Sequence, residues 1–211
     1  HSRGASYEYG NPKLNVNNHP FINENKNIAL VHNGKIEQFD YIFHKKDFNL
    51  KSKCDSELYL KFIENSDNII NGIENLWTKL KNSQMAIAIG YYLDDDNKSL
   101  YLFKNKHRSL WIIDARQYLN QIFFVSTKEI WEKSIKDVGI YFNNFKIIEI
   151  NPNELYEIKL QNNKFIINKF NAKVVKSCNK INVEDSLSLP TKKFKSITGL
   201  NKKDKINYIK N

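Results

Sequence analysis

The sequence predicts an α+β fold in which helices cover the faces of antiparallel sheets. Apolar residues recur at helical spacing in three segments between residues 36 and 80. From residue 84 the pattern changes to a run of short strand-like segments. Short polar turns, such as residues 94–99 and 161–163, join neighbouring strands, which is typical of antiparallel pairing.

The first half of the chain predicts one strand and three helices. An apolar run over residues 27–32 indicates a buried strand, and Asn33 and Gly34 after it are a strong turn signal. Helices are expected over residues 36–46, from Asp55 or Ser56 to residue 65, and over residues 68–80. In the second helix the residues expected to face the core are Leu58, Leu60, Phe62 and Ile63.

The second half predicts mainly strands. Thr127 is expected to cap one short helix that follows it. The expected strands cover residues 84–93, 100–105, 110–114, 121–126, 145–150, 154–160 and 164–170.

Composition excludes several functional classes. The 211 residues are 41% hydrophobic, enough for one domain with a real core. No apolar run approaches the roughly 18 residues that a membrane span needs, and no signal peptide is visible, so we expect a cytoplasmic protein without a membrane partner. Cys54 and Cys178 lie far apart, and no Cys/His spacing indicates a metal site. No metal or other cofactor is expected.

The charge pattern divides the chain into a domain over residues 1–171 and a basic tail over residues 172–211. The tail has ten Lys and three acidic residues, so it carries +7 of the chain's +10. Nucleic-acid binding is not favoured, because Arg and interleaved aromatic residues are almost absent from the tail. We expect a linker or a docking segment.

Four short motifs occur in order in the first third of the chain: HSRGAS (1–6), NNHPF (17–21), ALVHNGKIEQFD (29–40) and KCDSELYLKFIE (53–64). Together they resemble the glutaminase domain of class II glutamine amidotransferases. The segments IFFVSTKEIWEKSI (122–135) and IIEINPNELYEIKL (147–160) resemble later strands of that family. The resemblance covers about residues 1–170.

The resemblance implies a fold and an activity. The fold would be the four-layer αββα sandwich of N-terminal-nucleophile hydrolases, incomplete at its N-terminus. The activity would be hydrolysis of L-glutamine to glutamate and ammonia, with the ammonia passed to an acceptor-using domain or subunit that these residues do not identify.

The resemblance also implies roles for single residues. The Asn33 side-chain amide and the Gly34 N–H would form an oxyanion hole, whereas in isolation an Asn-Gly pair is more often an ordinary turn. Arg3 would bind the substrate carboxylate, Asp55 its ammonium group, and Ser6 would also contact it. Asp55 has an alternative role as a helix N-cap. His19 and Pro20 match a loop near the family's site, although a structural role suits His19 better.

Three features depart from the family pattern. The family's nucleophile is an N-terminal Cys, whereas this sequence begins at His1, downstream of the matching position, and neither Cys54 nor Cys178 matches it. Gly4 and Tyr7 replace residues typical of glucosamine-6-phosphate synthase. Because the sequence does not begin with Met, we expect a fragment whose upstream piece carries the Cys. The alternative is a catalytically inactive domain with a structural or interaction role in a larger assembly.

Overall fold

The computed structural model describes residues 11, 13–80, 82–94, 97–140, 145–152, 154–162, 164–171 and 181–182. Three predicted site or cysteine positions, Arg3, Ser6 and Cys178, lie outside the described residues, as do Gly4 and Tyr7.

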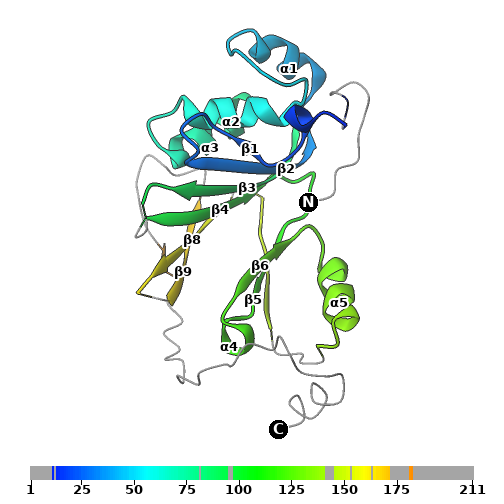
Figure 1. The fold of residues 1–211 in the computed structure, drawn as a ribbon, viewed down its shortest axis with the longest axis vertical. Coiled ribbons are helices and arrows are strands. Elements are labelled where there is room, and N and C mark those ends of the chain that lie inside the picture. Colours follow the sequence, from blue (N-terminus) through cyan, green and yellow to red (C-terminus); the bar gives the residue numbers. More distant parts are fainter. Residues whose placement is uncertain are drawn as a thin grey trace.

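The elements are arranged in four layers (Figure 1). Helices form the first layer, a seven-stranded antiparallel sheet the second, a three-stranded antiparallel sheet the third, and α5 the fourth. The prediction of an α+β fold with an αββα arrangement is therefore confirmed. The helices are α1 (Gln38–Lys45), α2 (Ser56–Glu64), α3 (Ile69–Lys79), α4 (Arg116–Leu119) and α5 (Lys128–Asp137), with a 3-10 turn at Asn15–Asn17.

The larger sheet has the strand order β1-β2-β3-β4-β8-β9-β10, and the smaller has the order β6-β5-β7. In the larger sheet the strands are β1 (Phe21–Ile22), β2 (Ile28–Lys35), β3 (Gln84–Tyr92), β4 (Lys98–Lys104), β8 (Glu154–Gln161), β9 (Lys164–Asn171) and β10 (Ile181–Asn182). In the smaller sheet they are β5 (Trp111–Asp114), β6 (Ile122–Val125) and β7 (Lys146–Glu149).

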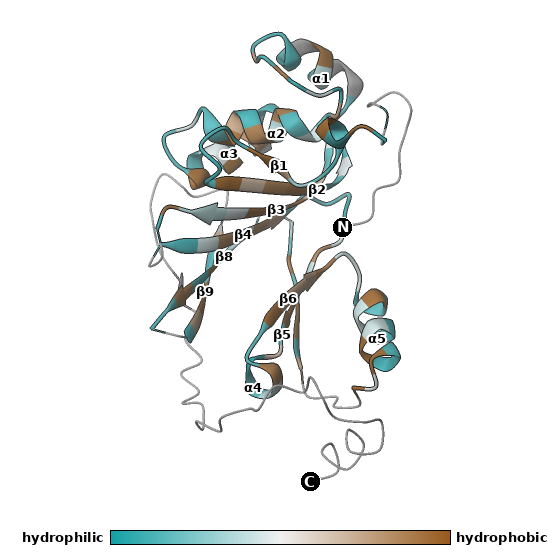
Figure 2. Ribbon diagram, in the orientation of Figure 1, coloured by the Kyte–Doolittle hydropathy of each residue, from teal (hydrophilic) through white to brown (hydrophobic). Residues whose placement is uncertain are grey.

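Two apolar cores hold the layers together. The first lies between the helices and the larger sheet and includes Leu58 and Ile73 from helices and Met85 from β3. The second lies between the two sheets and includes Ala88 and Ile112. Both faces of β3 are buried, which explains why its sequence reads as a continuous apolar run. Figure 2 shows the resulting hydrophobic colouring along the central strands.

The end of β2 differs from the sequence prediction. The expected strand stopped at His32, followed by an Asn-Gly turn. In the structure β2 continues through Asn33 and Gly34 to Lys35, which pairs with Gln84 of β3. Pairing with a buried neighbouring strand outweighs the local turn preference of Asn-Gly. Asn33 and Gly34 therefore lie within strand β2, near its C-terminal end.

Candidate functional site

The candidate site lies at the end of β2, beside the start of α2. His32 faces α2, where its ring packs edge-on against Tyr59 at 4.6 Å between centroids. Because side chains alternate along a strand, Asn33 faces the opposite side, toward the second sheet, as do Val31 and Ala86 of the core between the sheets. The Asn33 side chain is exposed, so its amide is available to a ligand.

The Gly34 N–H lies outside the ladder between β2 and β3. The Tyr92 N–H donates to the Asn27 carbonyl oxygen at 2.9 Å. Since hydrogen-bonded pairs alternate along an antiparallel ladder, the pair Gly34–Met85 is a non-hydrogen-bonded one. Met85 instead bonds to Asn105. Its carbonyl oxygen accepts from the Asn105 N–H at 2.9 Å, and its N–H donates to Asn105 Oδ1 at 3.2 Å.

On the other side of β2, strand β1 pairs only with Ala29 and Leu30 and so ends before Gly34. The Gly34 N–H is consequently directed toward a part of the sheet edge that β1 does not cover. Two neighbouring donors, the Asn33 amide and the Gly34 N–H, therefore lie together at this edge.

The backbone at Gly34 allows no side chain. Its φ is +154°, and a Cβ there would lie 2.0 Å from the Gln84 carbonyl oxygen and 2.6 Å from His32 Nε2. Glycine is thus required at this position by its conformation and by close contact with β3.

Asp55 is held against the end of β2. Its carboxylate is buried, 5% exposed, and Oδ2 accepts a 2.8 Å hydrogen bond from the N–H of Ile36. Its side chain does not cap α2, so the alternative role as a helix N-cap is wrong. The second oxygen, Oδ1, has only longer contacts, at 3.5 Å to Ser56 Oγ and 3.7 Å to Cys54 Sγ. The structure therefore joins Asp55 to the segment directly after β2, two residues beyond Gly34.

Cys54 is buried, 1% exposed, and lies in the first core. Its N–H donates to Ser52 Oγ at 3.1 Å. This placement suits a structural thiol better than a nucleophile, in agreement with the sequence prediction.

Sequence reasoning missed two residues near the candidate site. Glu57 is buried and accepts hydrogen bonds from the N–H groups of Lys51 and Ser52, at 2.8 and 2.6 Å, so it holds the loop before Asp55. Arg108 Nη2 donates to Gln84 Oε1 at 2.7 Å. An acidic residue in the first turn of an apolar helix was the available signal for Glu57. Nothing local pointed to Arg108.

The His19 ring packs edge-on against Phe21, with 5.1 Å between the ring centroids. This contact suits a structural role. The Pro20 that follows is exposed.

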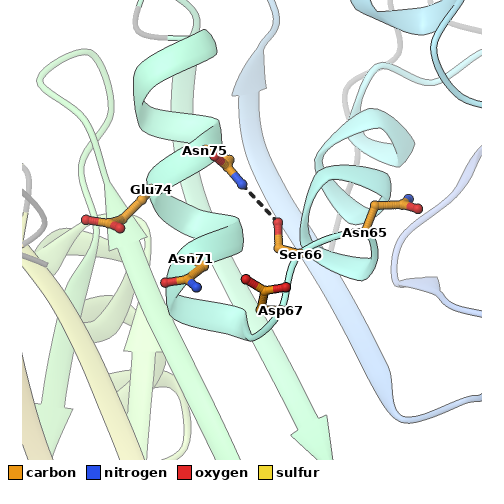
Figure 3. A pocket seen from close by; sticks show the side chains of 6 residues that line it. All are labelled: Asn65, Ser66, Asp67, Asn71, Glu74 and Asn75. Carbon is orange, nitrogen blue, oxygen red and sulfur yellow. Dashed lines mark hydrogen bonds between the residues drawn. The ribbon is translucent and has the colours of Figure 1, made fainter. Parts of the chain in front are cut away.

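A polar hollow of about 320 Å³ lies where α2 leads into α3 (Figure 3). A 3.1 Å hydrogen bond from Asn75 Nδ2 to Ser66 Oγ crosses it. The hollow contains none of the predicted site residues. It is lined by Asn65, Ser66, Asp67, Asn71, Glu74 and Asn75.

Within the described ranges, no group of three or more His, Cys, Asp or Glu side chains is placed to hold a metal ion. None of the helices in that part of the chain has the length and hydrophobicity to cross a bilayer.

Comparison with known proteins relates this fold to glutamine amidotransferases. No family model matches the chain. Over 105 residues, 47% of this chain, it is 30% identical to the glutamine–fructose-6-phosphate aminotransferase (isomerizing) of Clostridium perfringens, and the match spans only 16% of that protein.

Two solved structures also match. The glutamine phosphoribosylpyrophosphate amidotransferase of B. subtilis, solved with ADP and GMP, gives a TM-score of 0.50 at 17% identity over 72% of this chain and 30% of that chain. A structure of the allosteric regulatory enzyme of purine biosynthesis gives 0.47 at 16% identity over 73% and 31%. The chain thus spans less than a third of each of these proteins. Its fold is similar to that of part of the B. subtilis amidotransferase.

Proposed function

We propose that this chain is the glutamine-binding part of a class II glutamine amidotransferase, which hydrolyses L-glutamine to glutamate and ammonia for an acceptor not identified here. The observation that carries the proposal is the position of the Gly34 N–H, outside the β2–β3 ladder and next to the exposed Asn33 amide. The resemblance of the four N-terminal motifs and the partial likeness to the C. perfringens aminotransferase support it.

The chemistry explains why two donors are needed. A Cys thiolate attacks the side-chain carbonyl carbon of glutamine, and the carbonyl oxygen becomes a tetrahedral oxyanion. The Asn33 amide and the Gly34 N–H would each stabilise that charge by about 2.7–4 kcal/mol. The intermediate collapses when the C–N bond breaks and the nitrogen takes a proton to leave as ammonia. Water then hydrolyses the thioester, which releases glutamate and restores the thiol.

Asp55 and Arg3 would bind the two charged ends of the amino acid. The Asp55 carboxylate keeps one oxygen, Oδ1, free of short hydrogen bonds, so an ammonium group is a suitable partner. Arg3 remains our candidate for the α-carboxylate, with Ser6 as a further contact.

Calorimetric titration of the 211-residue chain with L-glutamine tests the binding proposal. We expect binding in the wild type, and a loss of about tenfold or more in Arg3→Ala and in Asp55→Asn, since charge-assisted hydrogen bonds contribute about 1.5–3 kcal/mol. Asp47→Asn is the matched control, because Asp47 is a surface acid with a side chain that is 53% exposed. Unchanged affinity in Arg3→Ala would remove Arg3 from the site.

The nucleophile is tested separately. We expect no glutaminase activity from the 211-residue chain, since Cys54 is buried, and activity from a full-length gene product that carries an upstream Cys. If the 211-residue chain released glutamate and Cys54→Ala abolished it, our assignment of Cys54 would be wrong.

The second candidate is a catalytically inactive amidotransferase-like domain that serves an assembly. The burial of Cys54 favours this inactive candidate, because a buried thiol is a poor nucleophile. A nucleophilic Cys elsewhere in the gene product would favour the enzyme. Reading the gene upstream of His1 distinguishes the two candidates: a Cys directly after an initiator Met or a propeptide supports the enzyme.

A further inference from the structure

His32 makes three contacts from a buried position at the centre of the candidate site. Its side chain is 4% exposed. Nδ1 lies 3.0 Å from Ser56 Oγ at the start of α2, and Nε2 lies 3.1 Å from the Gln84 carbonyl oxygen at the start of β3. The ring also packs against Tyr59. One side chain therefore joins β2, β3 and α2.

The partners determine how the ring carries its proton. A carbonyl oxygen only accepts, so Nε2 carries the hydrogen that it donates to Gln84. Burial lowers the pKa of His32, and the nearby Arg108 charge acts in the same direction, while Asp55 opposes it. The ring is consequently neutral at neutral pH. Nδ1 then accepts from the Ser56 hydroxyl, for which the Asp55 carboxylate is the more distant acceptor at 3.5 Å.

The same contact limits the backbone of Gly34. A Cβ at Gly34 would lie within 2.6 Å of His32 Nε2 and 2.0 Å of the Gln84 oxygen, so the Gly34 backbone rests directly on this hydrogen bond. On the other side of the ring, Ser56 neighbours Asp55, whose carboxylate binds the N–H of Ile36. Two links thus join the end of β2 to the start of α2.

We infer that His32 is a positioning residue, whose neutral imidazole holds the Gly34 N–H at a set place relative to Asp55. The His32 side chain does not itself contact the substrate. The inference rests on the proposed function for its catalytic consequence, because a displaced donor would stabilise the oxyanion less well while leaving ground-state binding almost unchanged.

The experiment compares four variants. His32→Ala removes both hydrogen bonds. His32→Gln keeps a donor near the position of Nε2, and Ser56→Ala removes only the partner of Nδ1. Tyr59→Phe is the control, since it keeps the ring against His32. The first readout is the amide signal of Gly34 in ¹H–¹⁵N spectra of the 211-residue chain, and thermal unfolding of each variant is measured alongside.

We expect the Gly34 amide signal to move in His32→Ala and to stay near its wild-type position in His32→Gln and Tyr59→Phe. Ser56→Ala should give a smaller shift. An unmoved Gly34 signal in His32→Ala would overturn the inference. If His32→Ala does not fold, the other two variants decide. The inference fails if the Gly34 signal is unmoved in Ser56→Ala. It also fails if His32→Gln moves that signal as far as Ser56→Ala does.

The second readout is glutaminase activity of the full-length gene product. We expect kcat to fall about ten- to hundredfold in His32→Ala with little change in KM, and His32→Gln to recover most of it. Equal kcat in wild type and His32→Ala would overturn the inference. If the wild-type protein neither binds nor hydrolyses glutamine, the proposed function fails, and the Gly34 signal alone decides the role of His32.

Discussion

At the scale of single residues, Gly34 and Gly139 separate two costs of a glycine substitution. Both have positive φ, +154° and +74°, but a Cβ at Gly34 would meet the Gln84 carbonyl, whereas a Cβ at Gly139 meets nothing within 4 Å. Gly139→Ala should therefore lower the free energy of unfolding by about 1–2 kcal/mol, from backbone strain alone.

Gly34→Ala should cost about 3 kcal/mol or more, because the strand must also move away from β3. Urea denaturation of both variants measures the difference. Similar losses in the two variants would contradict the close contact between Gly34 and Gln84.

His32 should make stability depend on pH. Its pKa in the folded protein is lowered by burial, so below about pH 6.5 the unfolded chain binds more protons than the folded chain. The His32 contribution is complete above that pH and is lost as pH falls toward the folded-state pKa, with a slope of at most about 1.4 kcal/mol per pH unit.

We expect His32→Gln to lack this contribution of His32 to the pH dependence of the free energy of unfolding. Urea denaturation at several values from about pH 7.5 to about pH 5 should show a shallower decline than in the wild type. Parallel curves for the two proteins would mean that folding does not lower the pKa of His32.

At the scale of elements, the helices begin in different ways. The Asn68 side chain accepts a hydrogen bond from the N–H of Asn71 at 2.9 Å and caps α3. Thr127 caps α5, as its sequence position predicted, with a bond of 3.3 Å from Ile130. In contrast, the acids at the start of α2 bind the N–H groups of preceding segments, Ile36 for Asp55 and residues 51–52 for Glu57.

Asn68→Ala should lower the free energy of unfolding by about 1 kcal/mol. Because Ile73 and Leu76 of α3 are buried in the first core, the loss should lower the stability of the whole domain and so its thermal unfolding temperature. Asn68→Asp, which keeps the acceptor, serves as the control. An equal loss in Asn68→Asp would show that the cap is not the cause.

At the scale of the whole molecule, we still predict that the basic tail over residues 172–211 docks on a protein surface instead of serving as a linker. Two of its residues, Ile181–Asn182, form β10 and pair with Lys169 and Asn168 of β9. The tail's net charge of +7 would add a salt-dependent attraction to any acidic surface, screened beyond about 10 Å at 0.1 M ionic strength.

We expect trypsin to cut the tail slowly at low salt in the full-length protein with its partners present. Faster cutting at high salt would indicate docking by charge, and unchanged protection would indicate docking by apolar residues. Rapid cutting at both salt concentrations would contradict docking and leave the tail as a linker.

Periodicity along the chain predicted most of the elements. The segment from Gln84 to Tyr92 was expected as a strand, and the segment from Ser56 to Glu64 as a helix with Leu58 and Phe62 facing inward. Two-residue strands such as β1 carry too short a pattern to be recognised. The four-residue helix α4 was missed for the same reason.

The sequence by itself determined most of the secondary structure and the residue types of the candidate site, because helix and strand periods are local properties of the chain. Only the tertiary structure decided three further features. It divided the strands between two sheets and placed β4 beside β8, since such pairings join residues far apart in sequence. The tertiary structure also set which residue pairs between β2 and β3 are hydrogen-bonded, and this register leaves the Gly34 N–H outside the ladder. It also directed the Asp55 carboxylate to Ile36 instead of to its own helix, because a buried acceptor binds whichever donor packing brings within reach.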